Sequence, residues 1–127
     1  MGFEDIKKDI HERLQLHDNI IIIENTDQLH IDKIKNGVVT IWVTWSPGFL
    51  NCINAIRHLH DKQYQGQIIV IDNDTVSIEF QIKTFGKRLL HGWGEIFFIK
   101  NGKVVKEFTG KESSIEFKSY FDKYADT

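Results

Sequence analysis

The sequence predicts an α/β fold in which a central mixed sheet is flanked by helices. Short apolar runs of β-branched residues alternate along the chain with segments of helical periodicity, which is typical of parallel strands joined by right-handed crossovers. An Asn101-Gly102 pair between two apolar runs predicts a β-hairpin that adds an antiparallel edge. The expected order is helix, strand, helix, strand, helix, strand, helix, hairpin, helix.

The first part of the chain predicts two helical segments and two strands. Residues 3–16 predict an amphipathic helix, because apolar residues recur there every three or four positions. The run "IIIIE" at 20–24 predicts a strand covered on both faces. Residues 25–37 support only a short helix or an irregular crossing. "VVTIWVTW" at 38–45 then gives the strongest strand signal in the sequence.

A helix is expected to follow this strand directly, from Ser46 to just before Gly66. Ser46 is a favoured N-cap, and Pro47 fits the first helical position, where its missing N–H costs nothing. Trp45 and Leu50 have the spacing of a hydrophobic staple. A structural role at a helix start is therefore enough to explain these residues.

The last part of the chain predicts a third buried strand, a short helix, the hairpin and a closing helix. "IIVID" at 68–72 reads as the strand. In the polar stretch 76–82 the apolar residues alternate as in a strand, but its place between buried strands favours a short helix. Ser113 with Glu116 makes a capping box for the closing helix.

Composition bounds the class of protein. With 127 residues, 41% hydrophobic and 12% aromatic, the chain fits a single domain over 1–127, in which 1–18 is a helical extension. Sixteen basic and eighteen acidic residues give a net charge of -2 without long like-sign runs, so we expect neither nucleic acid nor a membrane as partner. A single cysteine and an N-terminus without an apolar run indicate the cytoplasm.

No cofactor or metal is predicted. His58 and His60 lie two positions apart on a predicted helix and so point to different sides, and the other histidines show no ligand spacing. His91 could approach Ser46, but no orienting carboxylate is identifiable, so a surface or hydrogen-bonded histidine is favoured.

Three segments together give the sequence a family resemblance. "VVTIWVTW" runs into a helix, "IIVIDND" follows, and "GWGEIFFIKNGKVVKEFTG" closes the sheet. In these segments the chain resembles the thioredoxin family over roughly Asn19 to the C-terminus, and "FFIKNGKVV" is the most specific part. The resemblance implies a thioredoxin-like fold with an extra N-terminal helix.

The resemblance also implies that the family's redox chemistry is lost. In the family, a Cys-x-x-Cys at the helix start supplies a thiolate that attacks a disulfide. Here those positions look like Ser46, Pro47, Gly48 and Phe49, so both sulfurs are missing. The buried acid of the family corresponds to Thr40 and its cis-proline to Gly94. Dithiol exchange therefore has no chemical route in this chain, and no catalytic residue is assigned.

Cys52 and Ser46 leave an alternative open. Cys52 lies about two turns along the expected helix, on the stripe with Phe49 and Ile56, which predicts a buried, inert thiol. The functional alternative is a one-cysteine redox sensor. Ser46 has a second interpretation by analogy, because some glutathione transferases hold a thiolate with a serine at this helix start.

The former active-site face is the predicted binding surface. By resemblance it comprises Trp45, Ser46, Pro47, Gly48, Trp93, Gly94 and Glu95. Tryptophans flanked by glycine are typical interaction anchors. The alternative is that Trp93 closes the end of the core at a tight glycine turn, whereas Trp42 is expected inside the core.

Three functional hypotheses follow. The first is a redox-inactive, thioredoxin-like accessory or chaperone-like module that binds a protein or peptide, with backbone bonds near Gly94 and the tryptophans as anchors. The second is a monothiol or thiol-binding redox protein using Cys52 or Ser46. The third is a structural subunit that forms a homodimer through the strand 103–109 or the N-terminal helix.

Overall fold

A mixed five-stranded sheet organises the molecule. The computed structural model describes residues 8, 20–23, 29–42, 48–72, 76–86 and 93–124. The strands are β1 (Ile20–Ile23), β2 (Asn36–Trp42), β3 (Gln67–Asp72), β4 (Glu95–Lys100) and β5 (Lys103–Phe108). The helices are the 3-10 helix η2 (Ile31–Lys33), α2 (Phe49–Asp61), α3 (Ile78–Phe85) and α4 (Ser113–Tyr124). The predicted α/β class is confirmed.

The strand order is β1-β3-β2-β4-β5. β3 is parallel to both β1 and β2, whereas β4 is antiparallel to β2 and β5 is antiparallel to β4. β2 is therefore the central strand, and its Thr40 lies opposite Val70 on one side and Ile96 on the other. The Asn-Gly hairpin has the expected geometry, since both Asn101 and Gly102 adopt positive φ.

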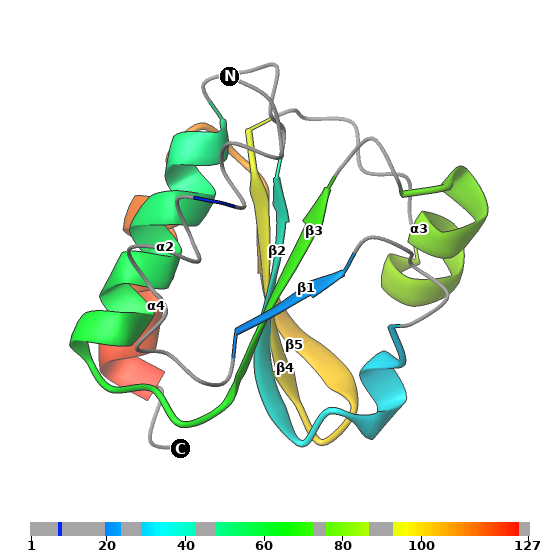
Figure 1. The fold of residues 1–127 in the computed structure, drawn as a ribbon, viewed down its shortest axis with the longest axis horizontal. Coiled ribbons are helices and arrows are strands. Elements are labelled where there is room, and N and C mark those ends of the chain that lie inside the picture. Colours follow the sequence, from blue (N-terminus) through cyan, green and yellow to red (C-terminus); the bar gives the residue numbers. More distant parts are fainter. Residues whose placement is uncertain are drawn as a thin grey trace.

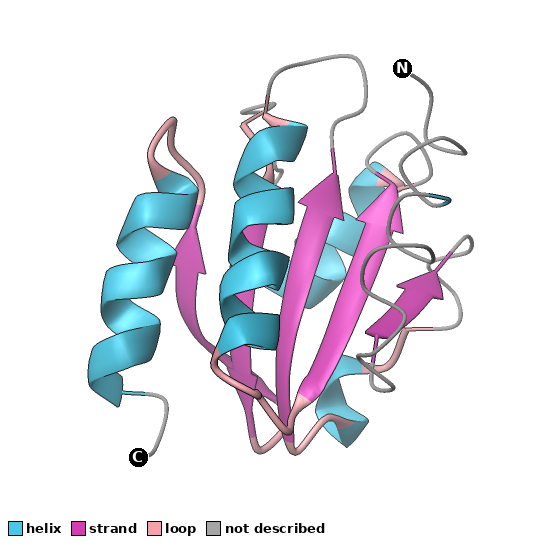
Figure 2. Cartoon of the chain, turned by 60° about the vertical axis from the view of Figure 1, so that its left-hand side comes forward, coloured by secondary structure: helices cyan, strands magenta, loops and turns pink. Residues whose placement is uncertain are grey.

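Helices cover both faces of the sheet (Figure 1). α2 and α4 pack on one face and lie side by side there (Figure 2), while α3 and η2 lie on the other. Alternate residues of β2 enter the two cores: Val38 and Trp42 pack under α2 and α4, and Val39 and Ile41 join the opposite cluster. The inner strands β2, β3 and β4 are thus covered on both faces, which explains their continuous apolar runs. The prediction that the strand at 20–24 is covered on both faces is wrong at Ile21, which is 41% exposed on the edge strand β1.

The two uncertain segments of the sequence take the expected form. Between residues 29 and 35, the described part of this segment that precedes β2, η2 is the one regular element, and the polar stretch after β3 contains the helix α3. Ser77 caps α3 by accepting a hydrogen bond from the Phe80 N–H at 3.0 Å, and Gly86, with φ +75°, ends it.

Two predicted helix starts are wrong. α2 begins at Phe49, three residues later than expected, and Gly48 precedes it in helical geometry. Ser113 is the first residue of α4, and the Glu116 N–H donates to the Glu112 carbonyl at 3.0 Å, so the predicted capping box does not form. The Ser113 hydroxyl donates to the distant Gly94 carbonyl. Ser46 and the N-terminal helix over 3–16 lie outside the described residues, apart from residue 8.

Candidate functional site at the start of α2

Four segments meet at one end of the sheet. They are the last residues of β2, the first turn of α2, Trp93 and Gly94 just before β4, and the start of α4. The resemblance places the former active site at this end.

A threonine and a tryptophan occupy the centre of this end of β2. Trp42 is fully buried, and its indole Nε1 donates to the Thr40 hydroxyl at 2.8 Å. Thr40, also fully buried, donates to the Ile69 carbonyl at 3.1 Å. The position that corresponds to a buried acid in the thioredoxin resemblance therefore holds a hydroxyl that satisfies the buried indole N–H, and it supplies no titratable group.

Cys52 is completely buried in the core between α2 and the sheet, near this end of β2. It is the fourth residue of α2, so it lies closer to the helix start than the sequence predicted. Its thiol lies 3.5 Å from the Ile41 carbonyl, to which it donates. Desolvation, and secondarily the negative charge of Glu95, raise the pKa of Cys52 well above its ordinary value. These two effects outweigh any stabilisation of a thiolate by the first turn of α2.

Gly94 allows the segment before β4 to pack directly on α2. Its φ is +81° and the Trp93–Gly94 peptide bond is trans. A Cβ added at Gly94 would overlap the Gly48 carbonyl oxygen and would lie 3.0 Å from the Cys52 sulfur. Only glycine combines this backbone conformation with so close an approach. The main chain at Gly94 therefore covers the thiol.

Asn51 ties three segments together. Its side-chain amide donates to the Trp93 carbonyl at 2.6 Å and to the Lys111 carbonyl at 3.2 Å. Its carbonyl oxygen accepts from the Ser114 hydroxyl at 2.9 Å. Nearby, the Ser113 hydroxyl donates to the Gly94 carbonyl at 3.1 Å. We call these four hydrogen bonds the Asn51 network. It fixes the main chain at Trp93 and Gly94 between the starts of α2 and α4.

Exposed apolar side chains flank this network. Trp93 is 38% exposed, Leu50 precedes Asn51 in sequence and is 51% exposed, and Ile115 follows Ser114 and is 61% exposed. The sequence interpretation named Trp93 but missed Leu50 as a surface residue and did not consider Ile115. Helix periodicity around Phe49 and Phe117 is the signal that places Leu50 and Ile115 off the buried stripes.

The predicted binding residues divide into three groups. Trp93 is exposed, whereas Gly48, Gly94 and Glu95 are buried and offer little surface for contact. Trp45, Ser46 and Pro47 lie outside the described residues.

The histidines of α2 are not brought together as metal ligands. His58 lies 2.7 Å from an Asp122 carboxylate oxygen and packs against Phe121. Among the described residues, no group of three or more His, Cys, Asp or Glu side chains has the geometry to hold a metal ion. None of the described helices is both long and apolar enough to span a bilayer.

Comparison with known proteins identifies the fold. The sequence matches no protein-family model and no curated protein. Solved structures do match: thioredoxin O2 from Arabidopsis thaliana has a TM-score of 0.65 at 14% identity, covering 84% of this chain and 94% of that chain. Plasmodium falciparum thioredoxin has a TM-score of 0.61 at 15% identity, covering 81% and 97%. The reduced desulfothioredoxin of Desulfovibrio vulgaris Hildenborough has a TM-score of 0.58 at 20% identity, covering 81% and 96%.

The chain has the thioredoxin fold. This confirms the predicted fold, apart from the extra N-terminal helix, which lies outside the described residues. The site described above occupies the end of this thioredoxin fold where α2 begins, and it contains one buried cysteine. Since the identities are low, the likeness concerns the fold alone.

Proposed function

We propose that this thioredoxin-fold domain is a redox-inactive accessory or chaperone-like module that binds a protein or peptide. One observation carries the proposal: the chain's single thiol is fully buried under Gly94, with a raised pKa. A thiolate is the species that attacks a disulfide, and burial disfavours it. With no second cysteine in the chain, a mixed disulfide could not be resolved intramolecularly.

The proposed contact surface consists of Trp93, Leu50 and Ile115; residues 45–47, which the sequence analysis assigned to it, lie outside the described residues. Exposed apolar side chains of this size contribute binding energy when a partner buries them. The Asn51 network supports this role, because a main chain held on both sides presents Trp93 at low entropic cost. The partner that fits is an apolar segment of a protein or peptide.

The mode of docking differs from the one expected from the sequence. Extended-peptide binding would use backbone groups near Gly94. The Gly94 carbonyl already accepts from Ser113 and the Trp93 carbonyl from Asn51. Recognition in this proposal therefore rests on side chains. The single buried thiol suits a reducing compartment, so the cytoplasm remains the proposed location.

The competing proposal from the enzyme class is a monothiol or thiol-binding redox protein that uses Cys52 or Ser46. The favouring observation is that Cys52 lies in the first turn of α2, directly beside the main chain at Gly94. Displacement of that segment would expose the sulfur. In the preferred proposal, thiol titration of the native protein is slow, and insulin reduction is no faster than in a Cys52→Ser variant. Glutathione-linked turnover that Cys52→Ser abolishes would establish the enzyme instead.

The binding surface has its own test. Affinity capture from the native cytosol is compared for wild type, Trp93→Ala and Ile78→Ala, since Ile78 is 47% exposed but lies on α3, across the sheet. We expect Trp93→Ala to lose proteins that wild type and Ile78→Ala retain. Recovery of the same proteins by all three would place the contact surface elsewhere.

A homodimer remains the third proposal. Val105 on β5 is 46% exposed, and β5 forms one edge of the sheet. Size measurements over a wide concentration range test this, and a size that stays monomeric throughout would exclude it.

A further inference from the structure

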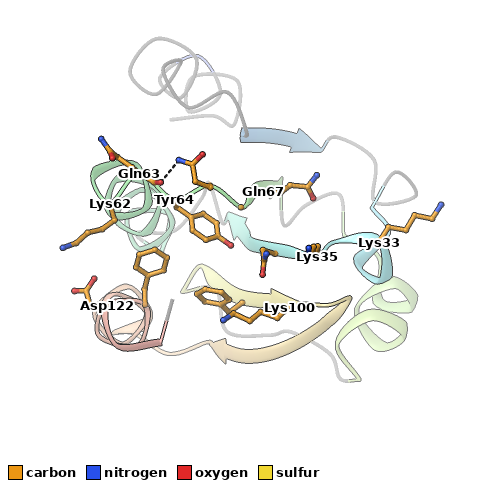
Figure 3. A pocket seen from close by; sticks show the side chains of 13 residues that line it. Lys33, Lys35, Lys62, Gln63, Tyr64, Gln67, Lys100 and Asp122 are labelled. Atoms are coloured by element: carbon orange, nitrogen blue, oxygen red, sulfur yellow. Dashed lines mark hydrogen bonds between the residues drawn. The ribbon is translucent and has the colours of Figure 1, made fainter. Parts of the chain in front are cut away.

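A basic cleft lies at the end of the sheet opposite the α2 start. Its volume is ≈ 1010 Å³, at the upper end of the range of about 300–1,000 Å³ for small-molecule sites. Residues from four places line it: the start of β2, the turn from α2 to β3, the end of β4 and the end of α4 (Figure 3). It shares no residue with the proposed contact surface.

Positive charge is concentrated in this cleft. Among the described residues that line it, four are lysines and one, Asp122, is an acid, so these residues carry a formal charge of +3. The whole chain carries -2. Asp122 lies 2.7 Å from His58, which offsets part of its charge. The lysines are Lys33, Lys35, Lys62 and Lys100. Such segregation of charge attracts anions and raises their local concentration.

Neutral hydrogen-bonding side chains add to the lining. Asn36, Gln63, Gln65 and Gln67 contribute amides, the three glutamines alternating through the turn before and into β3. Gln63 adopts φ +56°, and the Gln65 amide donates to the Gln63 carbonyl at 2.8 Å, which fixes this turn. The main-chain N–H groups of residues 62–64 donate to carbonyls at the end of α2. These bonds weaken the negative field that a helix C-terminus would otherwise direct at an anion.

A packed aromatic cluster forms part of the cleft wall. The rings of Tyr64, Phe98 and Phe121 all line it and contact each other, with centroids 5.5–6.3 Å apart. Lys100 Nζ lies 5.7 Å from the Phe98 ring centroid, so this ammonium is held by a cation–π contact. The cleft wall is therefore formed before any ligand arrives, which lowers the cost of binding.

The geometry points to a small oligophosphate as the ligand of this cleft. Lysine ammonium groups act as separate point charges, which suits a chain of phosphates carrying several negative charges at intervals. Figure 3 shows Lys35 and Lys100 between Lys62 and Lys33, whose side chains point outward at the two ends of the cleft. The described residues of the lining include no arginine, the side chain that best recognises an isolated carboxylate by a planar fork. A free oligophosphate and the phosphate chain of a nucleotide share this chemistry.

Calorimetric titration of the full chain at low salt tests the assignment. The probes are sodium tripolyphosphate, ATP without metal, and pyromellitate, a tetracarboxylate whose charge at neutral pH is close to that of ATP. We expect saturable 1:1 binding of tripolyphosphate with a Kd of about 1 mM or tighter, and pyromellitate weaker by about fivefold or more. If ATP binds with the same affinity as tripolyphosphate, the ligand is a free oligophosphate. If ATP binds more tightly, the ligand is a nucleotide.

Matched charge variants make the test specific. Lys35→Gln/Lys100→Gln removes two charges from the cleft and should weaken binding about tenfold. Lys83→Gln/Lys111→Gln removes two charges from α3 and from the segment just before α4, outside the cleft, and should change the Kd less than about twofold. Amide chemical-shift changes at residues 33–36 and 62–67 locate the bound anion. No saturable binding of tripolyphosphate or ATP, equal loss in both variants, or pyromellitate as tight as tripolyphosphate would each overturn the inference.

Discussion

Replacing Gly94 with alanine should destabilise the fold and uncover the buried thiol. Gly94 has φ +81°, a conformation that costs a residue with a Cβ about 1–2 kcal/mol. The new Cβ would also overlap the Gly48 carbonyl oxygen and crowd the Cys52 sulfur at 3.0 Å. Because the overlap is with main chain, relief requires the segment to move, at a cost of about 1–3 kcal/mol. The free energy of unfolding should therefore fall by about 2–5 kcal/mol.

Alanine substitutions at two other glycines distinguish the cost of the positive φ from the cost of the steric overlap. Gly86 has φ +75°, but an added Cβ would have no neighbour within 4 Å, so Gly86→Ala should cost only the backbone share of about 1–2 kcal/mol. Gly110 has neither a positive φ nor a neighbour within 4 Å, so Gly110→Ala should change stability by less than about 0.5 kcal/mol. Urea denaturation of the three variants gives the comparison directly.

Thiol reactivity adds a second readout. If the segment at Gly94 moves to relieve the overlap, Cys52 in Gly94→Ala should react with an aromatic disulfide reagent faster than in wild type or Gly86→Ala. Equal destabilisation by Gly94→Ala and Gly86→Ala, together with unchanged thiol reactivity, would refute the reasoning that the close approach at Gly94 seals the site.

Three further predictions concern polar groups inside the fold. Asn51→Ala should lower the free energy of unfolding by about 1–3 kcal/mol, because it removes three hydrogen bonds; an unchanged urea midpoint would contradict this. The pKa of Cys52 is raised above its ordinary 9.0 and that of Tyr64 from 10.0 to about 12, so the unfolded chain loses these protons first. Stability should then fall as pH rises above about 9, by at most ~1.4 kcal/mol per pH unit per group. Urea denaturation at several pH values should show that the free energy of unfolding falls less steeply with pH in Cys52→Ala and in Tyr64→Phe than in wild type. Thr40→Val should cost about 1–3 kcal/mol by leaving the Trp42 N–H without its acceptor, and a double-mutant cycle with Trp42→Phe should show coupling.

The strands and the hairpin were predictable because their signals are local. A sheet buried on both faces requires apolar residues at successive positions, and the runs at 20–23, 38–42 and 68–71 meet that requirement. The Asn101-Gly102 pair supplies two residues that tolerate positive φ, which is what the turn demands.

The helix starts show where local signals fail. Ser46-Pro47 is a good start sequence, yet α2 begins at Phe49. Ser113 and Glu116 have capping-box spacing, yet the Ser113 hydroxyl donates to Gly94, 19 positions away in sequence. The Glu116 N–H, which a capping box would direct to the Ser113 hydroxyl, donates instead to the Glu112 carbonyl at 3.0 Å, so the main chain satisfies it.

The Asn51 network and the basic cleft have no contiguous sequence signature. Asn51 bonds to carbonyls 42 and 60 positions away, and the carbonyl of any residue type could serve there. The cleft joins the segments 33–36, 62–67, 98–100 and 121–122, none of which is strongly basic in isolation. Both features arise only when the sheet order brings these segments to its two ends.

The backbone conformation at Gly94 and the burial of Cys52 form a single structural feature. Proline has φ near −65°, so it cannot replace a residue at φ +81° without rebuilding the segment. The absence of a Cβ at Gly94 lets the main chain approach α2 closely enough to cover the sulfur. Burial then raises the pKa of Cys52, and the nearby Glu95 raises it further. The main chain at Gly94 would have to move before Cys52 could react, so any thiol chemistry at Cys52 requires opening of the Gly94 segment.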